Sequence, residues 1–274
     1  MSLAAPYPEF EEIVQSIGDA GLRLSEIEAS EGAAGNISVY LGWPVEVRRK
    51  FPLEDTIDLP QAVPQLAGGT FLVTGSGRRL REIHVDPLAN IGCLVVNADG
   101  RTARLYTSPR RLFTRLTSEF NSHLAVHADQ IARSGTNFHA VVHGQPLQLT
   151  YLSHIATYRD ETYLNQHLLR WQPEAIVNLP EGIGVAAFQV PGSPELMAAT
   201  VEALRTHRVV VWAKHGVMAR SDVSVKRAAD RIEYAETAAR YECLNLAHGE
   251  RGEGLSAAEV RAICDFLGIQ QSIF

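Results

Sequence analysis

The chain has few cysteines and few lysines, and it has no long apolar run. Its 3 cysteines, at positions 93, 243 and 264, are odd in number and lack Cys-x-x-Cys spacing, which argues against a disulfide framework or a thiolate zinc site. No stretch of about 18 uncharged apolar residues is present, so we expect no membrane-spanning helix. Residues 1–10 lack the basic and apolar regions of a secretory signal. These absences together predict a protein of the reducing cytoplasm.

The charge balance also excludes a class of partner. The formal net charge is −6, and the arginines are spread along the chain instead of forming a basic patch, so we expect no dedicated nucleic-acid surface. The 274 residues, 46% of them hydrophobic, are enough to bury one sizeable core. We therefore expect a single domain over 1–274, with an N-terminal helical segment at about 1–30.

Strand-like and helical periodicities alternate along the chain, which predicts an α/β fold with one sheet covered on both faces. We predict strands at 37–40, 70–74, 138–144, 175–179, 184–190 and 210–216, and a hairpin over 91–107. Helices are expected at 9–24, from Thr117 or Ser118 as a cap to about 133, over 146–171, at 194–207, at 221–247 and from 256. Residues 44–69 look irregular.

Two apolar runs each end in a His-Gly pair, at His143 and His215. Residues i and i+2 of a strand share a face, so His143 and Gln145 can approach one ion, and His215 from a second strand can complete a nitrogen-rich zinc site. Two buried structural histidines are the competing explanation. His139 is too far back along its strand to share the ion.

Glu119 favours the metal site, because a carboxylate at a helix start beside an ion can act as ligand or general base. A rival arrangement remains open at this point. Glu119, His123 and His127 have i, i+4, i+8 spacing and could form a metal triad on one helical face.

Small and hydroxyl residues occur at three other places where strands end or a helix begins. Backbone amides, hydroxyls and a helix N-terminus bind phosphate well, although a single Gly-Ser-Gly is usually only a turn. The candidate phosphate contacts are Gly35, Asn36, Gly75, Ser76, Gly77, Thr117 and Ser118.

Six segments resemble, in the same order along the chain, the motifs of the class II aldolase/adducin family. They are Gly35-Asn36-Ile37-Ser38, Thr74-Gly75-Ser76-Gly77, Thr117-Ser118-Glu119, the His143 strand, 180–184 and His215-Gly216-Val217. Within that family the chain is most similar to the enzymes acting on rhamnulose 1-phosphate. The resemblance implies a three-layer αβα sandwich around a mostly antiparallel central sheet, a homotetramer with sites between subunits, and one zinc or other divalent ion per chain.

The resemblance also implies roles for individual residues. His143 and His215 match the metal ligands, and Glu119 matches the acid that handles protons beside the metal. Glu174 matches a second acid, which in the family reaches the site from a neighbouring subunit. The glycine, asparagine and hydroxyl residues named above match contacts to the phosphate or adjacent hydroxyls.

Two positions depart from the family pattern. The family has His-x-His where this chain has His143-Gly144-Gln145, and an amide oxygen is a weaker zinc ligand than imidazole. Ala33 stands where the rhamnulose enzymes are expected to have asparagine. Gln145 is therefore a candidate third ligand, and Ala33 leaves the identity of the sugar open.

The function implied is cleavage of a ketose 1-phosphate into dihydroxyacetone phosphate and an aldehyde, with Lewis-acid stabilisation of an enediolate. A Schiff-base mechanism on Lys214 is a chemical competitor, although a strand would point Lys214 away from His215. A non-catalytic adducin-like binding or assembly protein is a second alternative. A metal-dependent epimerase or decarboxylase is a third.

Overall fold

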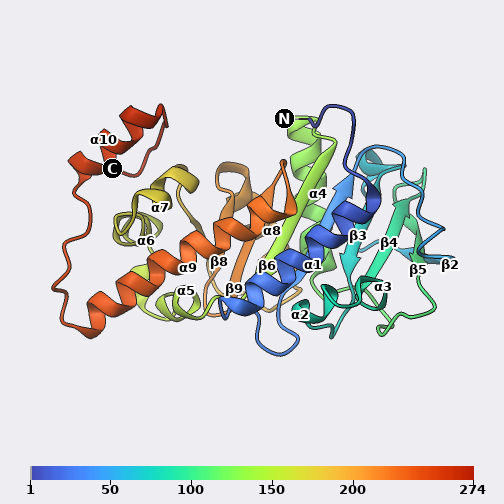
Figure 1. Cartoon of the computed structure of the whole chain (residues 1–274), viewed down its shortest axis with the longest axis horizontal. Helices are drawn as coiled ribbons and strands as arrows, with labels where there is room; N and C mark the ends of the chain where they lie inside the picture. Colours follow the sequence, from blue (N-terminus) through green and yellow to red (C-terminus); the bar gives the residue numbers. More distant parts are fainter. Residues whose placement is uncertain (1) are drawn as a thin grey trace.

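One nine-stranded sheet organises residues 2–274, which the computed structural model describes (Figure 1). The strand order is β2-β5-β4-β3-β1-β6-β9-β8-β7, and every neighbouring pair is antiparallel except β7 with β8. The strands are β1 (Asn36–Leu41), β2 (Leu53–Asp58), β3 (Thr70–Thr74), β4 (Ile91–Val96), β5 (Thr102–Thr107), β6 (Phe138–Gly144), β7 (Gly184–Ala186), β8 (Val209–Trp212) and β9 (Gly216–Ser221). The expected α/β class and mostly antiparallel sheet are confirmed.

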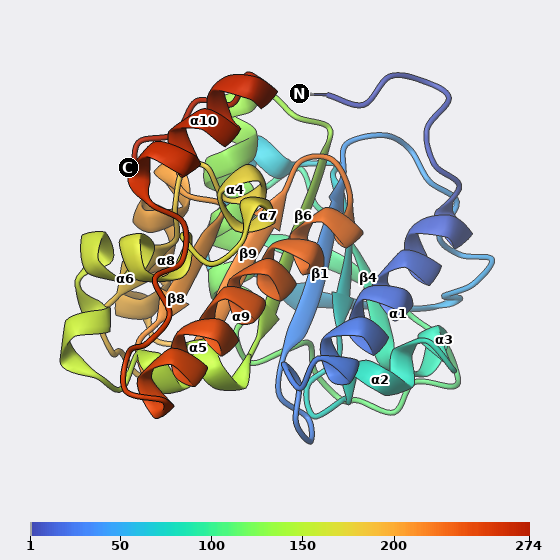
Figure 2. The ribbon, with the colours of Figure 1, turned by 60° about the vertical axis from the view of Figure 1, so that its left-hand side comes forward.

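Helices cover both faces of the sheet, which gives the expected three layers. α1 (Phe10–Glu26) and α9 (Val225–Ala247) lie side by side on one face, and α4 (Phe120–Ser134) and α8 (Pro194–Thr206) lie together on the other (Figures 1 and 2). The remaining helices are α2 (Leu80–Ile83), α3 (Pro87–Asn90), α5 (Leu147–Leu152), α6 (Glu161–Leu168), α7 (Pro173–Asn178) and α10 (Ala257–Leu267). Among the described residues, no helix is both long and apolar enough to cross a bilayer.

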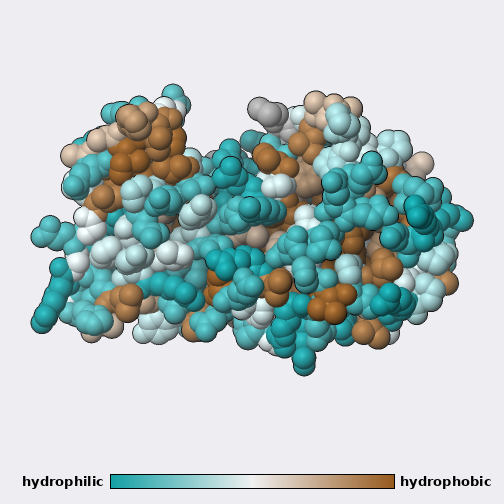
Figure 3. Space-filling model, viewed as in Figure 1, coloured by the Kyte–Doolittle hydropathy of each residue, from teal (hydrophilic) through white to brown (hydrophobic). Residues whose placement is uncertain are grey.

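The central strands are apolar on both sides because both faces are buried. In β6, Ala140 and Val142 pack in the core beneath α1 and α9, whereas Val141 belongs to the separate core beneath α4 and α8. In β8, Val209 and Val211 likewise face the first core and Val210 the second. This period of two is that of a strand buried on both faces. Apolar side chains left on the surface include Phe266 and Leu267 of α10, where Figure 3 shows an apolar patch.

Several expected elements differ in the structure. The strand expected at 175–179 is wrong: Pro173 opens the short helix α7. The segment 44–69 contains the strand β2, whose side chains are mostly exposed and therefore lack an apolar pattern. The helix expected over 146–171 is broken into α5, the 3₁₀ turn Ala156–Arg159 and α6. The run at 210–216 is also not one strand, since β8 stops at Trp212 and β9 starts at Gly216.

Three histidines are fully buried between α4 and the sheet: His123, His127 and His139. Burial disfavours the charged imidazolium and lowers the pKa of all three, to about 3 for His123 and His139. An unfolded chain would bind protons at these rings near pH 6.5. Stability is therefore fully present above about pH 6.5 and is lost as the pH falls toward the folded pKa values.

We predict that the free energy of unfolding of the metal-free protein falls between pH 7 and pH 5, by up to about 1.4 kcal/mol per pH unit for each of these histidines. Urea unfolding at the two pH values measures it. His139→Gln should reduce the slope, because it removes one of the three buried imidazoles. Equal stability at both pH values would contradict the prediction.

Candidate metal centre

Glu119, His143 and His215 come together at one end of the central strands. Each offers one ligand atom, and these atoms all lie within 4.8 Å of one another. Oε2 of Glu119 is 3.4 Å from Nε2 of His143, and Oε1 is 3.4 Å from Nε2 of His215. The structure therefore brings together three residues that the sequence placed in the site, from segments far apart in the chain.

His143 is held on β6 with one ring nitrogen free for an ion. Its Nδ1 lies 2.7 Å from the carbonyl oxygen of Val217, which can only accept, so Nδ1 carries the hydrogen. Nε2, which faces Glu119, is then the ring atom available to bind an ion. A hydrogen bond from the distal nitrogen is the usual way in which a metal-binding histidine is oriented.

His215 is placed by a tight turn between β8 and β9, not by the strand expected from the sequence. Lys214 has φ +65°, and the amide of His215 donates to the carbonyl of Trp212 over 2.9 Å. The Trp212 ring packs against both His143 and His215, with centroids 4.7 and 5.1 Å away. The indole N–H is fixed in turn by Thr200. One buried side chain thus supports both imidazoles.

Glu119 is the N-cap residue of α4, at the point where the helix meets the sheet. The cap expected from the Thr117 or Ser118 side chain is wrong, since no side chain caps this helix; the Thr117 hydroxyl instead lies 3.4 Å from the Glu119 amide. Oε2 of Glu119 accepts from Nδ2 of Asn36 over 2.8 Å. Burial acts to raise the pKa of Glu119, but His143 and the Asn36 hydrogen bond outweigh it and leave this pKa below its usual value.

The donor set fits a divalent cation. Ligand atoms around a tetrahedral zinc ion lie roughly 3.3–3.6 Å apart, given bonds of about 2.0–2.2 Å. Each carboxylate oxygen of Glu119 is 3.4 Å from one imidazole nitrogen, and one ligand atom from each of the three residues lies within 4.8 Å of the other two. The Nδ1 atom of His215 is buried and without a partner among the described residues, so the ring holds no competing contact there. Two imidazoles and a carboxylate are typical zinc ligands.

The rival helical triad is not formed. His123 and His127 do share a helical face with Glu119, but Nδ1 of His123 and Nε2 of His127 both contact Oγ of Ser38, at 2.6 and 2.8 Å. His139 contacts His127, away from the candidate ion site, as its place further back along the strand predicts. Both ring nitrogens of His123 and of His127 are occupied by core partners, so these two rings offer no ligand set with Glu119.

Gln145 lies beside the cluster. A Cβ built on Gly216 would sit 3.0 Å from Cγ of Gln145 and 3.1 Å from Cε1 of His143, so these two side chains flank the same glycine. The backbone N–H of Gln145 donates to the backbone carbonyl of Ala29 over 2.7 Å. The position agrees with the expected approach of Gln145 toward the ion, while coordination by its amide oxygen stays a prediction.

The three candidate phosphate segments are also brought together. The backbone N–H of Ser76 donates to the backbone carbonyl of Arg115, and that of Thr117 donates to the carbonyl of Thr74. These bonds join the loop after β3 to the segment before α4. The Gly75 amide is likewise bonded, to Asn90. Gly77, with φ +72° and open space around its α-carbon, and the exposed Ser118 are better placed to meet a ligand. Of the two remaining segment members, the Asn36 side chain is directed at Glu119, and Gly35 allows close approach to the His143 carbonyl.

A cavity of about 450 Å³ opens beside His215 and Gln145. Its lining adds residues that the sequence reasoning missed, among them Thr150, Tyr151 and His154, together with Glu28 and Glu31. The Thr150 hydroxyl is buried and has no partner in the part of the chain described. Thr150, Tyr151 and His154 follow the His143 strand closely, but the prediction of one helix over 146–171 hid the break after α5, whereas Glu28 and Glu31 come from the segment between α1 and β1.

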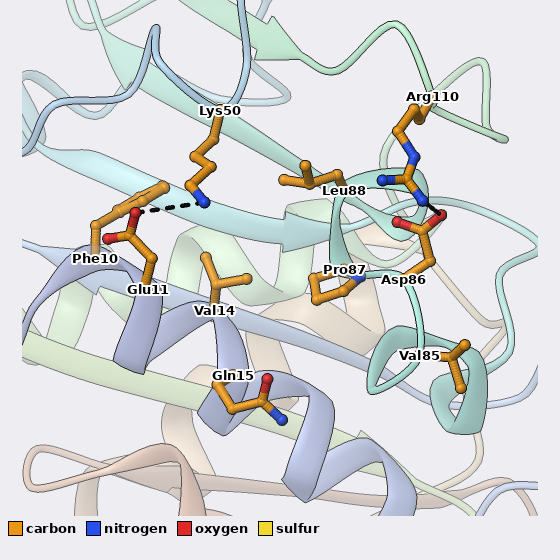
Figure 4. Close-up of a pocket in the computed structure, with 10 residues that line it drawn as sticks. All are labelled: Phe10, Glu11, Val14, Gln15, Lys50, Val85, Asp86, Pro87, Leu88 and Arg110. Carbon is orange, nitrogen blue, oxygen red and sulfur yellow. Dashed lines mark hydrogen bonds and ion pairs between the residues drawn. The ribbon is translucent and has the colours of Figure 1, made fainter.

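A second cavity, of about 290 Å³, lies between α1 and α3 (Figure 4). Its two basic side chains are already paired, Lys50 with Glu11 and Arg110 with Asp86, as Figure 4 shows. None of the metal-cluster residues lines it. We therefore place the candidate site at Glu119.

Two further sequence candidates lie outside the cluster. Glu174 is exposed in the first turn of α7. Lys214 is exposed in the turn before His215, whereas a Schiff-base lysine is activated in a desolvated pocket. The conclusion drawn for Lys214 holds for a different reason, because the residue is in a turn and not on a strand.

The chain is similar over most of its length to several named aldolases. Rhamnulose-1-phosphate aldolase from Escherichia coli O7:K1 is 28% identical over 213 residues, 78% of this chain and 77% of that protein. The rhamnulose-1-phosphate aldolase of Bacteroides thetaiotaomicron is 28% identical over 234 residues, 85% of each chain. The crystal structure of a sugar-phosphate aldolase from Thermotoga maritima matches with a TM-score of 0.74 and 30% identity, covering 88% of this chain and 98% of that one.

The family model that matches is the Class II Aldolase and Adducin N-terminal domain, over residues 15–243. This span includes the sheet, α4 and the turn that carries His215. With the fold and the Glu119, His143 and His215 cluster, it shows that the chain belongs to the class II aldolase and adducin family.

Proposed function

We propose that the chain is a metal-dependent aldolase that cleaves a ketose 1-phosphate, of the rhamnulose 1-phosphate kind, to dihydroxyacetone phosphate and an aldehyde. The observation that carries the proposal is the cluster of Glu119, His143 and His215, with ligand atoms within 4.8 Å of one another. The similarity to named rhamnulose-1-phosphate aldolases supports the substrate class.

His143, His215 and Glu119 would hold a divalent ion, which we propose to be zinc, with Gln145 as a fourth polar contact. The ion supplies Lewis-acid stabilisation of the negative charge that develops when the carbon–carbon bond breaks. Glu119 and His143 are buried and His215 is partly buried, so charge interactions within the site are stronger than in solution.

Glu119 is the proposed proton carrier. Its lowered pKa keeps it a carboxylate at neutral pH, ready to accept the hydroxyl proton whose loss accompanies cleavage. Asn36 holds Oε2, so Oε1 is the oxygen with fewer contacts within the chain. The proton would later return from Glu119 to the carbon left by the departing aldehyde.

We propose that the phosphate end and the aldehyde end of the substrate contact different groups of residues. The Gly77 amide and the hydroxyls of Ser76 and Ser118 are the groups we propose for the phosphate. The cavity beside His215 carries Glu28 and Glu31, whose charge disfavours phosphate and suits the hydroxyls of the aldehyde end. Thr150 would contact one of these hydroxyls.

Glu174 is proposed to act across a subunit boundary. It is exposed on α7 and outside the metal cluster of its own chain, which fits delivery to a neighbouring chain. The homotetramer that the family resemblance implies would provide that neighbour.

Purified protein loaded with Zn²⁺ should release dihydroxyacetone phosphate from L-rhamnulose 1-phosphate or a related ketose 1-phosphate. The release is measured by coupling to glycerol-3-phosphate dehydrogenase and following NADH. Chromatography of the products distinguishes cleavage from epimerisation or decarboxylation. No triose phosphate from any ketose 1-phosphate tested would reject the aldolase assignment.

Glu119→Gln should lower kcat by at least about 100-fold and change KM far less, because the amide keeps the shape and loses the proton-accepting oxygen. Steady-state kinetics on the zinc-loaded variant measure both constants. Glu174→Gln provides a comparison at an exposed carboxylate with a different proposed role. Wild-type turnover in Glu119→Gln would remove this residue from proton transfer.

His215→Ala should abolish tight metal binding, since it deletes one of the imidazole ligands. Extensively dialysed wild-type protein should retain about one divalent ion per chain by elemental analysis, and the variant should retain almost none. His84→Ala, at a partly exposed histidine paired with Asp19, is the matched control and should retain the ion. Equal metal content in wild type and His215→Ala would contradict the ligand assignment.

A further inference from the structure

A row of buried polar side chains leads from Glu119 away from the metal centre, between α4 and the sheet. All of its members are at most 7% exposed. Consecutive members contact one another through hydrogen-bonding atoms, in the order Glu119, Asn36, His123, Ser38, His127, His139. The direction of every hydrogen bond in this row can be assigned from its two ends.

The Glu119 end fixes the first donors. A carboxylate only accepts, so the Asn36 NH₂ group faces Oε2, and the amide oxygen faces Nε2 of His123. Nε2 of His123 must then carry the hydrogen. The ring is neutral because burial lowers its pKa to about 3, so Nδ1 accepts from the hydroxyl of Ser38 over 2.6 Å.

The same reasoning continues to the last ring. The Ser38 oxygen, having donated its hydrogen to His123, accepts from Nε2 of His127 over 2.8 Å. Nδ1 of neutral His127 therefore accepts from Nδ1–H of His139, also over 2.8 Å. Nε2 of His139 is left as a lone pair, and it is the ring atom that is buried without a partner among the described residues.

Every donor in the row therefore points toward Glu119. Aligned hydrogen bonds polarise one another, so removal of one member weakens the others. The opposite direction would turn the Asn36 amide oxygen against the Glu119 carboxylate. The Asn36 amide does not pass a proton from one of its ends to the other, so the row orients groups and does not conduct protons.

We propose that His123, Ser38, His127 and His139 are positioning residues which fix the orientation of the Asn36 amide and thereby aim the Glu119 carboxylate between His143 and His215. None of the four touches the metal centre. Partners behind the ligands of metal sites are worth about 10–100-fold in metal affinity or activity. The kinetic consequence rests on the proposed aldolase function, whereas the hydrogen-bond directions and the metal affinity do not.

Selective ¹⁵N-histidine NMR of the metal-free wild-type protein tests the directions without any assay of activity. We expect His123 and His127 to be Nε2–H tautomers and His139 to be the Nδ1–H tautomer. Single substitutions at each histidine assign the signals. An Nδ1–H tautomer at His123 or His127, or a mixture of tautomers, would overturn the proposal.

Ser38→Ala breaks the row at its middle. Its matched control is Ser122→Ala, which removes the hydroxyl of another fully buried serine, on α4, that has no partner in the described chain. For Ser38→Ala we expect kcat to fall about 10–100-fold with KM within about threefold, and Co²⁺ affinity to fall about tenfold. Ser122→Ala should match wild type in all three quantities.

The outcomes separate the two proposals. If Ser38→Ala behaves like Ser122→Ala in Co²⁺ affinity, the positioning proposal fails whatever the activity. If the tautomers and the affinity loss are as expected but no ketose 1-phosphate is cleaved, the aldolase proposal fails and the positioning row stands. A thermal unfolding curve of each variant checks that the affinity is measured on folded protein.

Discussion

The pairing of β1 with β6 in one register is the constraint on which the metal centre depends. Asn36 is opposite His143 and Ser38 is opposite Val141. Because side chains alternate, this register puts the polar side chains of both strands on the face covered by α4, while Ile37 and Val39 enter the apolar core under α1 and α9. If β1 were shifted by one residue against β6, its polar side chains would face the apolar core and its apolar side chains would face α4. The apolar contacts of β1 therefore specify the polar chemistry on its other face.

The three proposed ligands are fixed by three different kinds of local structure. His143 belongs to a central strand, His215 to a turn with a left-handed residue before it, and Glu119 to the N-cap of a helix. Trp212 contacts both imidazole rings, so the turn cannot move independently of the strand. Such support from rigid elements is what metal sites need for a defined geometry.

The sequence predicted those elements of the fold that are encoded by residues close together in the chain. The hairpin over 91–107 forms as β4 paired with β5, and Ser256 and Glu259 form a capping box where the last helix was expected to begin. The strand β2 was missed because its exposed side chains show no alternation, and α7 because six residues are too few for a helical period.

For the candidate site, the sequence predicted which residues take part but not the local structure that holds all of them. The order of motifs identified Glu119, His143 and His215, but the turn at Lys214 depends on tertiary contacts, such as the bond from its amide to Ser153. The i, i+4, i+8 spacing of Glu119, His123 and His127 correctly indicated a shared face and could not say what lies opposite. Ser38, which joins the two histidines, comes from a strand more than eighty residues away.

The central position of the ligands also has a thermodynamic consequence. β6 and β9 lie in the interior of the sheet, and the ligand-bearing segments meet only after strands distant in sequence have paired. An unfolded chain therefore holds no preformed ligand set, and an ion that binds the native state shifts the folding equilibrium by RT ln(1 + [L]/Kd). An ion bound at the proposed site would therefore stabilise the entire sheet through linkage, in addition to serving the chemistry beside it.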